Sequence, residues 1–448
     1  MHENAGQLQQ SLKQRHLTMI ALGGVIGAGL FVGSANVIKS VGPAACLTYA
    51  LTGVLIVMVM RMLGEMASAN PSTGSFTSYG RLAFGDWAGF TGAWLYWYFW
   101  VIVVGFEAVA GAGILQKWLP VMPLWSLSLG LLLVMTASNL FSVRSFGEFE
   151  YWFAGIKVVA ILLFMVTGGL YVLGLWPGHS MDFSNLNVGG SLFPNGLSAI
   201  FSGIVIVVFS MVGAEIATIA AAESPDPANA IIKATRSVIM RILLFYVGSI
   251  FLLTVILPWN SLTPGSSPFV TAFEVMGFHG AGDVMNAVVL TAVLSCLNSG
   301  VYTASRMLFV LAGKGEAPAA LTVTSRRSVP VRAILASTFV GYLAVIASYI
   351  SPDTVFLFLL NSSGAVILFV YLLIAASELV LRSKTPDDCL KIKMWAFPLL
   401  TLSTIAAMVA VLAMMAFQEE ARSQLILSLM SVAVVIGAYF LKKRSLSP

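Results

Sequence analysis

The heptapeptide "GGVIGAG" (residues 23–29) places four glycines in an otherwise apolar segment. Glycine inside a helix costs about 1 kcal/mol relative to alanine, so this segment forms a weak helix. Further along, "FSMVGAE" (209–215) sets a glycine beside an acid in apolar sequence. Two interpretations are open for such stretches. The small residues let helices pack closely in a membrane, or the helix is interrupted there.

The composition indicates a polytopic membrane protein. Of the 448 residues, 58% are hydrophobic and 10% charged, whereas soluble domains carry about 25% charged residues. Sixteen polar residues lead directly into the first apolar segment, which indicates a retained span and not a cleaved signal. We predict an all-α fold with twelve transmembrane helices, at residues 17–40, 43–67, 87–116, 121–141, 148–176, 195–222, 230–257, 283–312, 331–350, 354–381, 395–417 and 423–441.

The distribution of basic residues predicts the orientation. Twelve spans put both termini on one side, and with the N-terminus inside, the outer loops hold only Lys39, Lys117 and Arg422. An excess of Lys and Arg marks cytoplasmic loops. We therefore predict a cytoplasmic N-terminal segment (1–16) and a cytoplasmic tail (442–448). This distribution explains the net charge of +5 without a nucleic-acid partner.

The two glycine stretches each open a set of five predicted spans. Secondary transporters built from inverted repeats place broken helices at corresponding points of their halves. Unpaired backbone groups are tolerated in a membrane only where they line a cavity or meet protein, so the pairing favours interruption over packing. Freed N–H groups attract a carboxylate, and freed carbonyls attract an ammonium. The predicted repeats are 17–176 and 195–381, with two more spans in 395–441.

Ionisable residues inside predicted spans are costly and usually functional, and we single out Lys157, Glu107 and Glu215. Lys157 lies within the fifth span, and snorkelling to the interface is its alternative interpretation. Glu107 and Glu215 are predicted to pair with an amine or carry a proton, or else to cap a loose helix end. Glu148 and Glu150 lie at a predicted helix start, which favours acids, and are assigned no function.

Other polar and aromatic features are given structural roles. The run "WLYWYFW" (94–100) favours anchoring at the membrane interface over an aromatic cage. Ser295 is expected to bond between helices. The three cysteines and four histidines are scattered and give no metal spacing, and "LAGKGE" (311–316) lacks the complete phosphate-binding motif. We expect no catalytic residues, no metal and no cofactor.

Six long motifs, among them "RHLTMIALGGVIGAGLFVGS" (15–34) and "GAEIATIAAAES" (213–224), resemble the amino-acid permeases of the amino acid–polyamine–organocation superfamily. The resemblance extends over all predicted spans, and within the family it is greatest to bacterial γ-aminobutyrate (GABA) permeases through "ASNLFSV", "GEFE" and "GAEIATIAAAES". The motifs are "RHLTMIALGGVIGAGLFVGS" (15–34), "GPAACLTYALTGVLIVMVMRMLGEMA" (42–67), "PSTGSFTSYG" (71–80), "SFGEFEYWFAGIKV" (145–158), "GAEIATIAAAES" (213–224) and "NSGVYTASRML" (298–308).

The resemblance implies a LeuT-type fold, with inverted five-helix repeats whose first and sixth helices are broken. It implies proton-coupled uptake, in which Lys157 replaces the cation of sodium-driven members, and Glu107 receives the substrate amine. The substrate carboxylate is expected on the backbone of the first break, and the sixth span lines the pocket with Phe209 as a gate. The implied substrate-binding residues are Ile26, Gly27, Ala28, Gly29, Glu107, Phe209, Met211 and Val212, and Glu215 joins them from its place beside the second break.

The leading expectation is a symporter of the bacterial cytoplasmic (inner) membrane that imports a zwitterionic amino acid, foremost GABA. The charges of an ω-amino acid lie several bonds apart, so one break cannot hold both, and Glu107 or the carbonyls at 209–212 would receive the amine. The expected partners are a small-molecule amino acid, protons and the lipid bilayer, with the oligomeric state open. D-alanine or glycine, proline and aromatic amino acids are alternative substrates. A transporter-like sensor and a channel are alternative functions.

Overall fold

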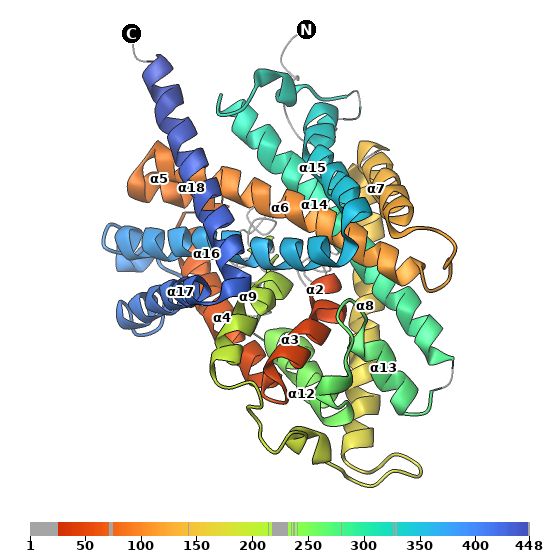
Figure 1. The fold of residues 1–448 in the computed structure, drawn as a ribbon. Coiled ribbons are helices and arrows are strands. Elements are labelled where there is room, and N and C mark those ends of the chain that lie inside the picture. Colours follow the sequence, from red (N-terminus) through yellow and green to blue (C-terminus); the bar gives the residue numbers. More distant parts are fainter. Residues whose placement is uncertain are drawn as a thin grey trace.

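The computed structural model describes residues 26–70, 75–141, 143–213, 215–216, 232–233, 235, 238–239, 241–278, 280–325, 327 and 329–446. All regular elements in this described part are helices (Figure 1). The N-terminal segment 1–16, residues 23–25 of the first glycine stretch and Ala214 of the second lie outside it.

The helices of the first half begin with two short consecutive pieces and continue with longer ones. Their bounds are α2 (Ala28–Phe31), α3 (Gly33–Val41), α4 (Ala45–Ala69), α5 (Ser75–Phe84), α6 (Asp86–Leu115), α7 (Leu124–Phe141) and α8 (Val143–Val172). A long connection with the short helix η1 (Ser184–Asn187) leads to the second half.

The helices of the second half again begin with a short piece. Their bounds are α9 (Ser198–Met211), the π-helix η2 (Ile242–Gly248), α12 (Ser249–Ile256), η3 (Trp259–Ser261), α13 (Pro268–Val275), α14 (Ala281–Gly313), η4 (Ala319–Thr322), α15 (Val331–Ile350), α16 (Pro352–Arg382), η5 (Asp387–Cys389), α17 (Leu399–Phe417) and α18 (Glu419–Leu446).

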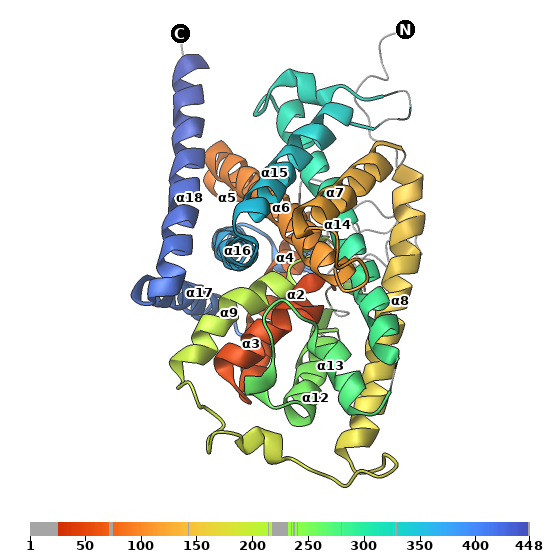
Figure 2. The same cartoon turned by 45° about the vertical axis from the view of Figure 1, so that its right-hand side comes forward.

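The helices divide into a buried centre and an apolar periphery. A helix that is hydrophobic all round is either buried in protein or faces lipid. Helix α6 is mostly buried and packs most extensively against α14 and α16. Helices α8 and α18 expose most of their apolar residues and stand on opposite sides of the bundle (Figure 2). The core therefore lies around α6 and α14, next to the short helices α2 and α9.

The number of spans is only partly visible in the described residues. Nine of their helices are long and apolar enough to cross a membrane: α4, α6, α7, α8, α14, α15, α16, α17 and α18. Three shorter apolar helical stretches, 28–41, 198–211 and 242–256, lie in the other predicted spans. The total of twelve stays a prediction.

Two α-helices, α5 and α13, lie in segments that are predicted to connect spans. Helix α5 follows α4 and buries Phe76 and Tyr79, while α13 occupies part of the segment expected to be a loop at 258–282. Proline is favoured in the first turn of a helix, and Pro268 opens α13. Phe269 then packs edge-on against Phe31 of α2 at 5.0 Å. Aromatic packing against α2 thus stabilises α13, and a hydropathy pattern does not predict such a contact.

Candidate functional site

The first predicted break is described from Ile26 onward, immediately before α2. Gly27 has an extended backbone (φ −130°, ψ −154°), and the helix begins at Ala28. The first N–H groups of a helix have no intrahelical acceptor, so the Ala28 N–H requires another partner. The carbonyl of Ile26 lies outside the helix and is also available. All of residues 26–29 are buried.

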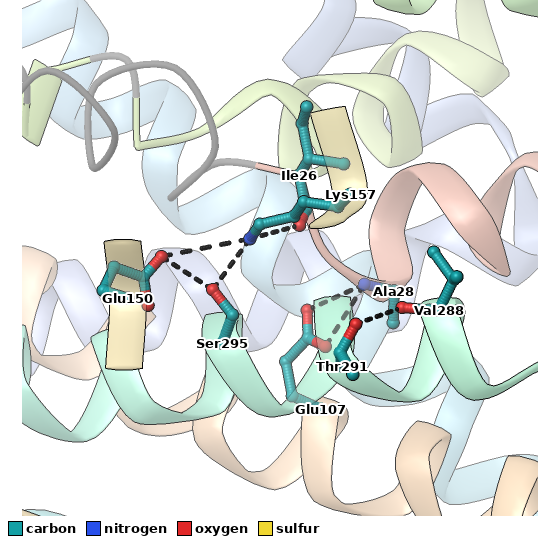
Figure 3. Close-up of polar contacts among 8 residues, drawn as sticks. All are labelled: Ile26, Ala28, Glu107, Glu150, Lys157, Val288, Thr291 and Ser295. Atoms are coloured by element: carbon teal, nitrogen blue, oxygen red, sulfur yellow. Dashed lines mark hydrogen bonds and ion pairs between the residues drawn. The ribbon is translucent and has the colours of Figure 1, made fainter. Parts of the chain in front are cut away.

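Glu107 of α6 provides the acceptor for the exposed amide of α2. Both of its carboxylate oxygens lie 3.2 Å from Ala28 N (Figure 3), and its side chain is buried. A carboxylate is stabilised at the positive end of a helix. The sequence predicts a substrate carboxylate on this backbone, so Glu107 occupies the position expected for that group.

Two glycines of the first break are required by the close approach of neighbouring helices. A Cβ on Gly27 would lie 2.6 Å from Glu107 Oε1 and 2.7 Å from Cys296 Cβ. A Cβ on Gly29 would lie 2.8 Å from Ser210 Cα. Such distances are far below van der Waals contact, so only glycine lets α6, α14 and α9 reach the break. Close packing and interruption, alternatives at the sequence level, coincide here.

The second break follows α9. Met211 ends the helix, and Val212 is extended (φ −63°, ψ 153°). Gly213 has φ +100°, a conformation that side-chain-bearing residues rarely adopt. The Gly213 N–H donates to both carboxylate oxygens of Glu215, at 3.1 and 3.0 Å. The acid next to the break therefore caps the break itself.

Glu215 is held by two further donors from distant helices. The Tyr96 hydroxyl of α6 donates to Oε1 at 3.0 Å, and the Tyr371 hydroxyl of α16 donates to Oε2 at 3.3 Å. The carboxylate is fully buried. This arrangement matches the helix-end cap that the sequence offered as the alternative role of Glu215.

A small cavity lies where the two breaks meet α6 and α14. Its volume is about 10 Å³, which is about the space that one water needs, so an amino acid fits only if lining side chains move. Phe209 packs edge-on against Phe106 with ring centroids 4.8 Å apart. The lining residues are Gly27, Gly29, Phe99, Trp100, Val103, Glu107, Phe209, Ser210, Val212 and Cys296.

The lining set overlaps with the predicted site without matching it. Ile26 and Ala28 supply the backbone groups at the break, whereas Met211 and Glu215 lie outside the lining set. Phe99 and Trp100 belong to the aromatic run that was expected at the membrane interface. They precede Glu107 by eight and seven residues, about two helical turns, and this spacing is a signal that could have placed them at the site.

Lys157 of α8 contacts the same break from the other side. Its ammonium donates to the Ile26 carbonyl at 2.9 Å and to Ser295 Oγ at 2.8 Å (Figure 3). The side chain has 0% exposed surface, so it does not snorkel to the membrane interface. One backbone segment therefore contacts a buried carboxylate and a buried ammonium.

Glu150 joins this cluster, although the sequence assigns it no function. Its Oε1 lies 4.0 Å from Lys157 Nζ and accepts a hydrogen bond from Ser295 Oγ at 2.6 Å. Glu150 is fully buried, and its Oε2 has no hydrogen-bond partner among the residues that the structure describes. Seven residues separate the acid from the lysine, which is about two helical turns and places both on one face of α8. This spacing is the signal that identifies the pair.

Two irregular segments, one before α2 and one after α9, meet at a small cavity inside an apolar helical bundle, an arrangement typical of a secondary transporter. Within the described part of the chain, no group of three or more His, Cys, Asp or Glu side chains is placed to hold a metal ion. The polar contacts at the first break come from backbone groups and buried charged side chains.

The chain belongs to the amino acid permease family, whose pattern it matches over residues 16–446. It is 52% identical to the gamma-aminobutyric acid permease of Bacillus subtilis over 452 residues, covering 100% of this chain and 96% of that protein. It is 40% identical to the aromatic amino acid transport protein AroP of Corynebacterium glutamicum over 437 residues, covering 96% and 93%. The predicted family is confirmed, and with it amino-acid transport across a membrane.

The fold is also that of a solved transporter. The chain superposes on a manganese transporter mutant of Eremococcus coleocola with a TM-score of 0.61, covering 98% of this chain and 97% of that one at 10% sequence identity. At this identity the likeness concerns the fold alone. The predicted LeuT-type helical fold is thereby confirmed.

Proposed function

We propose that the protein is a proton-coupled symporter that imports GABA or a related ω-amino acid by alternating access. The observation that carries the proposal is the double contact at the first break, where Glu107 meets Ala28 N–H and Lys157 meets the Ile26 carbonyl. A substrate that exchanges with one contact changes the surroundings of the other, because the two backbone groups are two residues apart.

In the proposed binding step the substrate carboxylate replaces Glu107 on the backbone of residues 26–29. The displaced Glu107 carboxylate then receives the ammonium group of the substrate. The two charges of an ω-amino acid are several bonds apart, so the amine reaches beyond the break. Phe209 moves aside to open the cavity and returns as a gate, with Met211 and Val212 supporting it from the end of α9.

In the proposed coupling step Lys157 carries the transported proton. As an ammonium it donates to Ile26 O and Ser295 Oγ and is attracted to Glu150. When the proton leaves, the attraction to Glu150 is lost and Lys157 holds the break less firmly. Glu150 is proposed to stabilise the charged form of Lys157 in its buried position, because a buried cation without a counter-charge is costly.

The proposed orientation places both termini in the cytoplasm of a bacterial cell. The asymmetry of Lys and Arg between predicted loops supports it. GABA as substrate is supported by the higher identity to a permease of that name, 52% against 40% for the aromatic transporter. An aromatic amino acid is the second candidate, because Phe99, Trp100 and Phe209 line the cavity.

The test is uptake of radiolabelled GABA by purified full-length protein in liposomes with an imposed proton gradient. We expect accumulation that an uncoupler abolishes, that sodium does not change, and that ω-amino acids inhibit more strongly than phenylalanine. Uptake that ignores the proton gradient would contradict the coupling. Accumulation of phenylalanine without accumulation of GABA would support the proposed transport activity but contradict GABA as its substrate.

A further inference from the structure

A second, larger pocket is lined by residues of α5, of the start of α6, of the segment that follows α14 and of the end of α18. Its volume is about 590 Å³, against about 10 Å³ for the cavity at the breaks. The two pockets share no lining residue. The lining of the larger pocket is Arg81, Asp86, Phe90, Lys314, Glu316, Tyr439, Lys442 and Lys443.

The lining carries an excess of positive charge. Four of its side chains are cationic and two are carboxylates, which leaves a net charge of +2. Arg81 contacts both acids, with Nη1 2.9 Å from Asp86 Oδ1 and Nη2 2.5 Å from Glu316 Oε1. The two carboxylates are thus grouped around one guanidinium, and the three lysines supply the excess.

The cations of this pocket repel one another. Partial burial and the neighbouring positive charge of Arg81 lower the pKa of Lys314, which lies beyond the end of α14. The ammonium of Lys442 donates to the Gly315 carbonyl, which ties the end of α18 to the same loop. An anion between these groups would relieve the repulsion.

Four exposed apolar side chains are sequence neighbours of the pocket lining, and we call them the apolar rim. Leu82, Trp87, Phe440 and Leu441 are 54%, 38%, 55% and 71% exposed, and each is next in sequence to a residue of the pocket lining. Inside the pocket, the Phe90 and Tyr439 rings pack with centroids 5.5 Å apart. A ligand there meets cations at one end and an exposed apolar surface beside them.

We propose that this pocket binds the phosphate headgroup of an anionic phospholipid, with the acyl chains lying along the apolar rim. Basic pockets between transmembrane helices are suited to such headgroups. A phosphate group can also come from free phosphate in solution. The apolar rim favours the lipid, because free phosphate gains nothing from it.

The experiment compares lipid retention by native mass spectrometry of the full-length protein released from nanodiscs of phosphatidylglycerol or phosphatidylcholine. We expect retained phosphatidylglycerol and no retained phosphatidylcholine. The double variant Lys442→Gln/Lys443→Gln should weaken phosphatidylglycerol retention by about fivefold per lysine. The control Lys384→Gln/Lys391→Gln removes the same charge from exposed positions elsewhere and should retain lipid as the wild type does.

A second variant and a competitor complete the test. Lys314→Gln should also weaken retention, and thermal stability of each variant shows that the fold is intact. Equal loss in both double variants, or no loss in Lys442→Gln/Lys443→Gln, would overturn the site. Displacement of phosphatidylglycerol by millimolar inorganic phosphate would overturn the lipid as its ligand and assign the pocket to free phosphate.

Discussion

The two helix breaks are capped by carboxylates that come from different distances along the chain. At the first break, the amide of Ala28 meets Glu107, which is 79 residues away on another helix. At the second, the amide of Gly213 meets Glu215, which is two residues away. Both acids are buried, and both accept from a backbone N–H.

This difference separates a site that exchanges its anion from one that keeps it. Glu215 forms its cap within one turn of chain, and Tyr96 and Tyr371 hold it there, so a ligand would have to displace these two hydroxyls as well as the Gly213 N–H. Glu107 caps Ala28 only while α6 and α2 stay aligned. We infer that the first break exchanges the Glu107 carboxylate for that of the substrate. The second break instead maintains the turn of the chain at Val212 and Gly213, just after Phe209.

The largest effect on uptake is expected at Lys157, which contacts the first break through the Ile26 carbonyl. Lys157→Ala removes the ammonium that donates to Ile26 O and Ser295 Oγ, and it should abolish proton-driven accumulation of GABA in liposomes. Exchange of internal for external GABA without a gradient should persist, because the backbone site remains. Wild-type accumulation by this variant would remove Lys157 from the mechanism.

Glu150→Gln should have a smaller effect on accumulation than Lys157→Ala. Glutamine preserves an acceptor for Ser295 Oγ but removes the negative charge 4.0 Å from Lys157. We expect accumulation to fall and its dependence on external pH to shift, while exchange stays near the wild-type rate. An unchanged pH profile would show that the pair is structural.

Glu107→Gln tests the exchange at the first break. Loss of a charged hydrogen bond of about 1.5–3 kcal/mol should raise the KM for GABA by about 10- to 100-fold. Inhibition by butyrate, which lacks the amine, should be unchanged or stronger, because glutamine competes less well for the helix end. Glu215→Gln is the matched control and should leave the KM within about twofold. An unchanged KM for Glu107→Gln would contradict its role as the amine partner.

Gly27→Ala should have the next largest effect. Its Cβ would meet Glu107 Oε1 at 2.6 Å, and overpacking of this kind costs about 1–3 kcal/mol. We expect uptake to fall by about tenfold or more, with little change in expression. Gly113→Ala is the control on α6, since a Cβ there meets nothing within 4 Å. Equal uptake by the two alanine variants would argue against close approach at the break.

The helices and the two breaks could be predicted from the sequence, whereas most side-chain contacts at the breaks could not. Apolar runs and glycine pairs predict the helices and the breaks, because membrane burial imposes strong constraints on both. Contacts between distant helices leave weaker traces. The sequence does not reveal that Glu107 reaches Ala28 or that Tyr96 and Tyr371 meet Glu215, since the partners depend on how helices rotate in the bundle. The pairing of Glu150 with Lys157 could have been predicted from their seven-residue spacing. It was not predicted, because acids are favourable at a helix start and Glu150 was interpreted in that way.

The smallest effects are expected at the tyrosines of the second break. Tyr96→Phe and Tyr371→Phe each remove one hydroxyl donor to the Glu215 carboxylate, and the loss of one hydrogen bond to a charged group costs about 1.5–3 kcal/mol. Thermal unfolding of the purified variants should therefore shift down by a few degrees, while the KM for GABA changes by less than about twofold. The 3.0 Å bond from Tyr96 is shorter than the 3.3 Å bond from Tyr371, so Tyr96→Phe should cost more. A large rise in KM with unchanged stability would mean that Glu215, and not Glu107, meets the substrate, and the assignment of the two breaks would be reversed.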